Sequence, residues 1–125
     1  MQHPIVIYQK PTCTTCRQVH KALVAAGVDF EAVNYYLEPI PKEKLVELLG
    51  KMGIGARELV RRNEPVYKEL GLSEREVTET ELIDLMALHP DLIQRPIVEC
   101  GPRAILARPA ERLAEILGDT PQTPR

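Results

Sequence analysis

The chain has 125 residues, of which 44% are hydrophobic and 27% are charged. This length fits one domain with a substantial core, and the composition argues against intrinsic disorder. Sixteen basic residues stand against 18 acidic residues, for a formal net charge of −2. That balance excludes a global polycation of the kind that binds nucleic acid, although it is compatible with a local basic pocket.

Neither a signal peptide nor a membrane helix is expected. The first residues lack a basic segment followed by an apolar one, and no apolar run approaches the roughly 18 residues of a membrane span. The three cysteines, an odd number, fit poorly with a secreted disulfide framework. We therefore expect a cytoplasmic protein with a single domain over residues 1–118 and a flexible polar tail over residues 119–125.

The first 36 residues predict a strand–helix–strand unit. Residues 5–8 form an apolar, β-branched run that is typical of a buried strand. A helical period begins near Thr15 and ends at Gly27, and residues 30–36 predict a second strand. Such a crossover is normally right-handed with parallel strands. The apolar positions expected on the inner face of the helix are Val19, Ala22, Leu23 and Ala26.

Residues 41–90 predict a helical segment. A helix is expected over residues 42–52, with short helices or turns over residues 57–62 and 65–70. Two capping boxes, the usual signature of a helix start, follow at residues 73–76 (SERE) and 78–81 (TETE). The second box opens a helix that ends before Pro90.

The remaining chain predicts a hairpin and a final helix. Residues 96–99 and 104–107 flank the turn residues Gly101 and Pro102, and residues 109–117 have a helical pattern. The order is therefore β-α-β, several helices, β-β and α. This is an α/β protein with a thioredoxin-like mixed sheet, and its helical insertion lies between the N-terminal βαβ and C-terminal ββα units.

Two of the three cysteines lie where the first strand passes into the first helix. Unpaired N–H groups and the helix dipole favour a thiolate at Cys13. Cys16 follows about one turn later, within reach for a disulfide, and Arg17 adds positive charge. After a leading strand, such a pair is a fairly specific redox signal.

Two plainer interpretations of these cysteines are weaker. Inert packing residues would not be expected beside polar threonines at a helix start. A zinc site could use Cys16, His20 and Cys100, but the second ligand pair of a structural zinc site is missing. We therefore expect no metal, and we interpret His20 as a solvent-facing helix residue.

Ten of the 16 basic residues are arginine, whose planar fork matches oxyanions better than the point charge of lysine. Most arginines are solvated surface groups. Three have informative places: Arg61 within the helical insertion, Arg95 before Pro96, and Arg108 before Pro109. In a thioredoxin-like fold the loop before the third strand lies beside the first helix, so Arg95 is expected to face Cys13.

Nearly the whole chain resembles the arsenate reductases of the glutaredoxin-coupled type. The matching stretches are residues 7–8 (IY), 11–13 (PTC), 52–54 (MGI), 57–63 (RELVRRN), 67–72 (YKELGL), 82–84 (LID), 89–90 (HP), 95–98 (RPIV) and 108–111 (RPAE). Their number, order and separation make the resemblance specific.

The resemblance implies an enzyme that reduces arsenate to arsenite. Cys13 matches the nucleophile of that family, and Arg61, Arg95 and Arg108 match the arginines that hold the oxyanion. The proline that matches Pro96 follows a cis bond. We expect Thr12, Thr14, Thr15, Arg17 and Pro96 to complete the substrate pocket.

The resemblance also implies an external thiol reductant, either glutathione with glutaredoxin or thioredoxin, and no bound cofactor. We expect a monomer whose partners are arsenate and that reductant, with no nucleic-acid or membrane partner.

The chain departs from the family at two places. Better-known members have His-Asn-Pro where this chain has Gln9, Lys10 and Pro11, so Lys10, Arg17 and the helix terminus are expected to ionise Cys13. Those members also lack a cysteine matching Cys16. Cys16 could resolve the intermediate as a Cys13–Cys16 disulfide that thioredoxin reduces, and Cys100 is a weaker candidate for this role.

The extra cysteine also leaves an alternative function open. Spx-type regulators share this fold, bind RNA polymerase and sense oxidation through such a pair. The alternative is therefore a redox-sensing transcriptional regulator with a Cys13–Cys16 switch. The stretches at residues 67–72 and 108–109 match the reductases better, which favours the enzyme.

Overall fold

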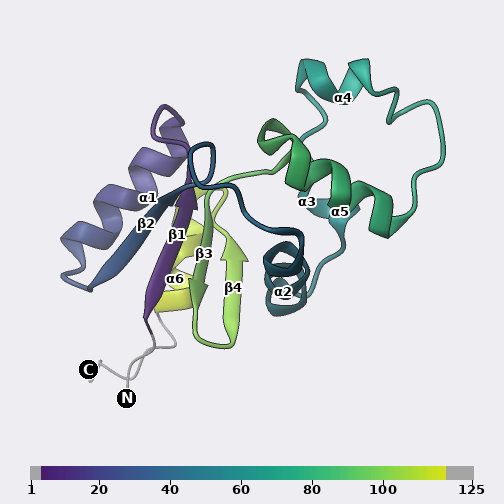
Figure 1. Cartoon of the computed structure of the whole chain (residues 1–125). Helices are drawn as coiled ribbons and strands as arrows, with labels where there is room; N and C mark the ends of the chain where they lie inside the picture. Colours follow the sequence, from purple (N-terminus) through teal and green to yellow (C-terminus); the bar gives the residue numbers. More distant parts are fainter. Residues whose placement is uncertain (1–3, 118–125) are drawn as a thin grey trace. The chain divides into compact units, whose positions relative to one another are not determined.

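The computed structural model describes residues 4–117, which divide into two compact units (Figure 1). Unit 1 contains the described residues of Met1–Glu38 and Arg95–Arg125, and unit 2 is Pro39–Gln94, close to the expected insertion of residues 41–90. The expected tail, residues 119–125, lies outside the described residues. Within residues 4–117, no helix has the length and apolar character needed to cross a membrane.

Unit 1 is built on a four-stranded mixed sheet with strand order β2-β1-β3-β4 (Figure 1). Strand β1 (Ile5–Gln9) pairs in parallel with β2 (Phe30–Asn34) and antiparallel with β3 (Ile97–Cys100). Strand β3 in turn pairs antiparallel with β4 (Arg103–Leu106). The predicted α/β class and mixed sheet are confirmed.

One face of this sheet is covered by α1 (Thr14–Ala25) and by α6 (Leu113–Leu117), which follows the 3₁₀ helix η2 (Ala110–Arg112). The prediction that Ala22 and Ala26 face inward is wrong, because both are exposed. Ala22 lies about 100° around the helix from Leu23, outside the narrow buried stripe. The core on this face consists of Ile5, Ile7, Val19, Leu23, Val98, Cys100, Ile105, Ala107, Leu113 and Ile116.

The strand register gathers four chain segments at one end of the sheet. Gln9 is opposite Asn34, Tyr8 is opposite Ile97, and Ile97 is opposite Leu106. The segments that follow β1, β2 and β4 and the segment that precedes β3 therefore meet at this end, which we call the site edge. Cys100 pairs with Ile5 at the opposite end of the sheet.

Unit 2 consists of four α-helices and one 3₁₀ helix within residues 39–94: α2 (Lys42–Met52), α3 (Ala56–Leu59), α4 (Pro65–Glu69), α5 (Glu79–Leu88) and η1 (Pro90–Leu92). Helix α5 contacts α2, α3 and η1, and a bridge between Val60 and Ile93 joins the segment after α3 to the segment after η1. The helix N-cap predicted at Thr78 is present, since its hydroxyl accepts from the Glu81 backbone at 3.1 Å.

The other capping box, at residues 73–76, does not begin a helix. Gly71 closes α4 with a φ of +65°, and the next helix is already capped by Thr78. The few residues between these two points are too short for a stable helix of their own.

Candidate active site

Cys13 caps the start of α1 at the site edge. A turn after β1 brings its backbone N–H to the Lys10 carbonyl at 2.9 Å, and its extended backbone then leads into the helix. Its Sγ accepts a hydrogen bond from the Cys16 backbone N–H at 3.3 Å. Cys13 is half-buried and Cys16 is fully buried, so Cys13 is the accessible sulfur of the pair.

The two thiols ionise very differently. Burial opposes ionisation of Cys13, but hydrogen bonds from the Cys16 side chain and backbone, together with the Arg95 guanidinium, lower its pKa below the ordinary 9.0. Burial and, to a smaller extent, its hydrogen bond to Cys13 together raise the pKa of Cys16 to about 12. Cys13 is therefore the more readily ionised of the two thiols, and the thiolate is the nucleophilic form.

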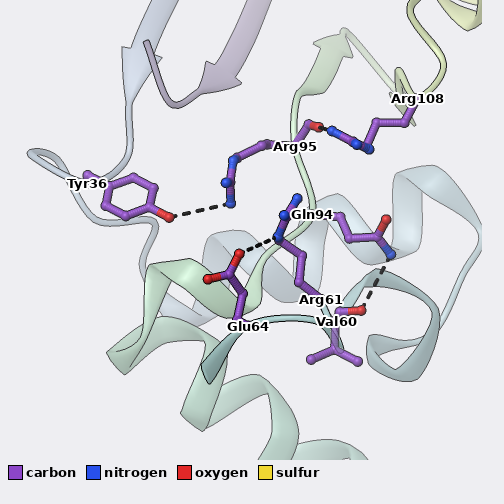
Figure 2. A network of polar contacts seen from close by, with 7 residues as sticks. All are labelled: Tyr36, Val60, Arg61, Glu64, Gln94, Arg95 and Arg108. Atoms are coloured by element: carbon purple, nitrogen blue, oxygen red, sulfur yellow. Dashed lines mark hydrogen bonds and ion pairs between the residues drawn. The ribbon is translucent and has the colours of Figure 1, made fainter. Parts of the chain in front are cut away.

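Arg95 is a buried cation at the same edge, with only 7% of its surface exposed. Its Nη1 donates to the Tyr36 hydroxyl at 3.4 Å, and its backbone carbonyl accepts from Arg108 Nη1 at 3.0 Å (Figure 2). Its buried Nε has no hydrogen-bond partner. Because an unpaired buried donor is costly, an anion beside Arg95 would satisfy a group that the fold leaves open.

Arg95 remains charged in this environment. Burial favours its neutral form, but Tyr35, Tyr36 and Cys13 outweigh this effect and raise its pKa above its ordinary value. Arg95 thus faces Cys13, as the sequence suggested, and supplies the charge that lowers the pKa of Cys13. We expected Lys10 and Arg17 in this role. Lys10 instead places its Nζ 4.8 Å from the centre of the Tyr36 ring, and Arg17 is exposed on α1.

The two arginine–proline pairs lie on either side of the β3–β4 hairpin. The Ala107 backbone N–H donates to the Pro96 carbonyl at 2.9 Å, which joins the two segments. The cis bond that the resemblance implies before Pro96 is present, and the bond before Pro109 is also cis. Pro96 is buried and Arg108 is half-buried.

The other candidate pocket residues are less enclosed. Thr12 follows β1 in a turn and is exposed, Thr14 is exposed at the start of α1, and Thr15 is half-buried. Arg61 belongs to unit 2, where its Nε donates to Glu64 Oε2 at 3.1 Å (Figure 2). Its backbone N–H bonds the Leu92 carbonyl at 2.7 Å, so the main chain of Arg61 is fixed within its own unit.

Sequence reasoning missed two tyrosines at the site edge. Tyr35 and Tyr36 directly follow β2, which runs parallel to β1. Residues that directly follow two neighbouring parallel strands are expected to lie close together. The predicted second strand extended to residue 36, so Tyr35 and Tyr36 were assigned to the strand and not to the site edge. A buried hydrogen bond from the Tyr8 hydroxyl to Glu99 Oε1, 2.8 Å long, was also missed.

The structure does not assemble the zinc ligands considered above. Cys100 lies at the opposite end of the sheet from Cys13. His20 is half-buried rather than solvent-facing, with its Nδ1 3.4 Å from Gln9 Oε1 and its ring edge-on to Phe30. Within residues 4–117, no group of three or more histidine, cysteine, aspartate or glutamate side chains is placed to hold a metal ion.

A cysteine with a lowered pKa that caps the first helix, at one end of a mixed four-stranded sheet, defines a thiol protein of the thioredoxin-like fold. The comparisons with known proteins make this more specific. The model of the ArsC family matches residues 8–116, and the chain belongs to this family. The resemblance to arsenate reductases is thereby confirmed.

Several relatives match most of the chain. The arsenate reductase of Escherichia coli K12 is 41% identical over 115 residues, which cover 92% of this chain and 82% of the relative. The uncharacterized protein YfgD of the same organism is 38% identical and is covered completely. The solved structure of an arsenate reductase from Vibrio cholerae has a TM-score of 0.87 and 33% identity, with 93% of this chain and 99% of that chain covered.

Proposed function

We propose that the protein reduces arsenate to arsenite, with the Cys13 thiolate as the nucleophile. The observation that carries this proposal is the half-exposed Cys13, its pKa lowered, beside a buried Arg95 whose Nε has no partner. A nucleophile and an anion-binding cation are thus adjacent. The membership of the ArsC family and the similarity to arsenate reductases support the choice of arsenate.

In the first step, guanidinium groups bind the arsenate oxygens by charge-assisted hydrogen bonds. Arg95 and Arg108, which contact each other, contribute from the site edge. We include Arg61 among the arsenate-binding arginines because residues 57–63, which contain it, match the family. Thr12, Thr14, Thr15 and Arg17 lie in the turn before α1 and in its first turn, beside Cys13.

The first covalent step joins sulfur to arsenic. The Cys13 thiolate attacks the arsenic atom, an S–As bond forms, and one As–O bond breaks with loss of the oxygen as hydroxide or water. Arsenic is still As(V) in this product. The positive charge of Arg95 stabilises the thiolate before attack and the oxyanion afterwards.

The second step transfers two electrons. The Cys16 thiol loses its proton to solvent, and its sulfur attacks Cys13 Sγ. The S–S bond forms as the S–As bond breaks, and the electron pair of the S–As bond passes to arsenic. The products are arsenite, in which arsenic is As(III), and a Cys13–Cys16 disulfide. An external dithiol or two thiols then reduce this disulfide.

Thioredoxin, or glutathione with glutaredoxin, fits the role of the external reductant. We place the reaction in the cytoplasm, and we propose that the protein is a monomer that binds no cofactor. The contact between Cys16 and Cys13 favours thioredoxin, because it supports an internal disulfide. Cys100 is a poorer resolving residue, since it lies opposite Ile5 at the far end of β1.

The nucleophile and the anion site are tested by measuring arsenite production with each thiol system. Cys13→Ser is expected to abolish production, and wild-type activity in this variant would exclude Cys13 as the nucleophile. Arg95→Ala should raise the KM for arsenate about 10- to 100-fold, the effect of losing charge-assisted hydrogen bonds. The matched control is Arg112→Ala, which removes an exposed arginine paired with Glu115; equal effects in the two variants would refute the pocket.

The resolving role of Cys16 has a separate test. Cys16→Ser should lose thioredoxin-dependent turnover while retaining turnover with glutathione and glutaredoxin, whose thiol attacks Cys13 directly. An unchanged rate with thioredoxin would show that Cys16 takes no part.

A redox-sensing regulator is the second candidate, supported by the same contact between the two cysteines. It requires oxidation of Cys13 and Cys16 but no arsenate turnover. Binding of the α-subunit of RNA polymerase under oxidising but not reducing conditions, without arsenite production, would favour it over the enzyme.

A further inference from the structure

Tyr36 contacts two cations at the site edge. Its hydroxyl accepts the hydrogen bond from Arg95 Nη1 at 3.4 Å, and the Arg95 guanidinium carbon lies 6.0 Å from the ring centre. The Nζ of Lys10 lies 4.8 Å from the same centre, within the range of a cation–π contact. Figure 2 shows the hydroxyl directed at the guanidinium.

The fold fixes this ring before any ligand arrives. Strand β2 ends at Asn34, whose Oδ1 accepts from the Tyr36 backbone N–H at 3.1 Å, so the chain turns at that point. The adjacent Tyr35 is buried, and its ring lies 5.2 Å from that of Tyr36. The ring of Tyr36 is therefore anchored by its own turn and by its neighbour.

Arg95 is consequently held at its main chain and at its guanidinium, with which the Tyr35 side chain also interacts. Arg108 bonds its backbone carbonyl, and Tyr36 bonds one terminal nitrogen of its guanidinium. A guanidinium is planar, so fixing Nη1 and the main chain also fixes the direction of Nε. That Nε is the buried donor that has no partner.

The choice of a hydroxyl as the partner has an electrostatic consequence. A carboxylate would orient an arginine equally well, but it would neutralise the positive charge that an oxyanion needs. Arg61, whose Nε is bonded to Glu64 Oε2 at 3.1 Å, illustrates this other arrangement. The phenol of Tyr36 orients Arg95 and leaves its charge available.

We propose that Tyr36 is a positioning residue, whose hydroxyl directs the Nε edge of Arg95 toward the oxyanion beside Cys13, and that Lys10 steadies the Tyr36 ring. The part that concerns the oxyanion rests on the proposed function. The part that concerns Cys13 does not, because Arg95 acts on that thiol whether or not arsenate is the substrate.

The test uses Tyr36→Phe, which keeps the ring and removes the hydroxyl, with Tyr67→Phe in α4 as the matched control. The first readout is the rate of iodoacetamide alkylation of Cys13 against pH. With the Tyr36 hydrogen bond to Arg95 lost, the midpoint should move to higher pH, and the rate at pH 7 should fall about threefold. Lys10→Met should move the midpoint in the same direction by a smaller amount.

The second readout is the arsenate concentration that half-protects Cys13 from alkylation. We expect it to rise about tenfold in Tyr36→Phe, the equivalent of about 1.4 kcal/mol, and to stay unchanged in Tyr67→Phe. In turnover, the KM for arsenate should rise with kcat within about twofold, the pattern of lost binding.

The outcomes separate the two proposals. If wild-type protein neither binds nor reduces arsenate but the alkylation midpoint moves in Tyr36→Phe, the positioning role stands and arsenate is the wrong substrate. If the midpoint and the protecting concentration both match the wild type, the positioning role is refuted, even if Tyr36→Phe unfolds more easily in urea.

Discussion

Limiting iodoacetamide at pH 8 should alkylate Cys13 and leave Cys16 and Cys100 unmodified in the folded protein. The expectation follows from the environments of the three sulfurs. Cys13 is half-exposed and its pKa is lowered by Cys16 and Arg95 against the effect of burial, whereas burial raises the pKa values of both Cys16 and Cys100.

The size of the preference follows from the thiolate fractions. Cys16 has a pKa of about 12, so at pH 8 about one Cys16 side chain in 10⁴ is a thiolate. Cys13 has a pKa below 9.0, so at least about one Cys13 in ten is a thiolate at the same pH. The ratio is at least about 10³ before the complete burial of Cys16 is considered.

The assay quenches the reaction at several times and quantifies the three cysteine-containing peptides by mass spectrometry. The control is the same protein in concentrated urea, where the three thiols lose their distinct environments and should react at rates within a few-fold of one another. Because the pKa of Cys13 is lowered by folding, its labelling should persist to lower pH in the folded protein than in urea. Labelling of Cys16 at more than about a tenth of the Cys13 rate would refute the ionisation scheme.

Three further variants test the stability of the fold. Tyr8→Phe removes the hydrogen bond to the buried Glu99 and should lower the free energy of unfolding by about 1.5–3 kcal/mol in urea melts. The control Tyr67→Phe should change the free energy of unfolding by less than about 0.5 kcal/mol. Equal losses in the two variants would contradict a role for the hydrogen bond between Tyr8 and Glu99. Gly53→Ala should cost about 1 kcal/mol, because Gly53 ends α2 at a φ of +71°. Gly50→Ala, in the same helix with open space at its Cβ position, should instead stabilise by about 0.5–1 kcal/mol; equal signs for the two glycine variants would refute this reasoning.

The sequence predicted the elements that local patterns determine. The apolar run of β1, the helical period after it and Gly27, with its φ of +72°, are local signals. They placed Cys13 at the start of α1 correctly. The width of the buried face of α1 was less predictable, since alanines such as Ala22 and Ala26 are small enough to lie on either the buried or the exposed face. Only the packing of the helix against the sheet determines which face they lie on.

The neighbours of Cys13 depend on register and could not be read from the pattern alone. Tyr36 reaches Arg95 because β1 and β2 are parallel and end together, although the two residues are 59 positions apart. The displacement of Lys10 onto the Tyr36 ring has the same origin. A sequence identifies the charged residues near a thiol, but the strand ends determine which of them acts on it.

The complete burial of Cys16 behind a half-exposed Cys13 dictates how an oxidised pair would be reopened. An incoming thiol can approach only the Cys13 sulfur, so Cys16 has to serve as the leaving group, and its departure is assisted when a proton reaches it. Any covalent complex with the reductant must therefore pass through Cys13. A thioredoxin that lacks its second cysteine should therefore be trapped in a disulfide with Cys13 of the oxidised protein, and Cys16→Ser, which cannot form the oxidised pair, should trap none.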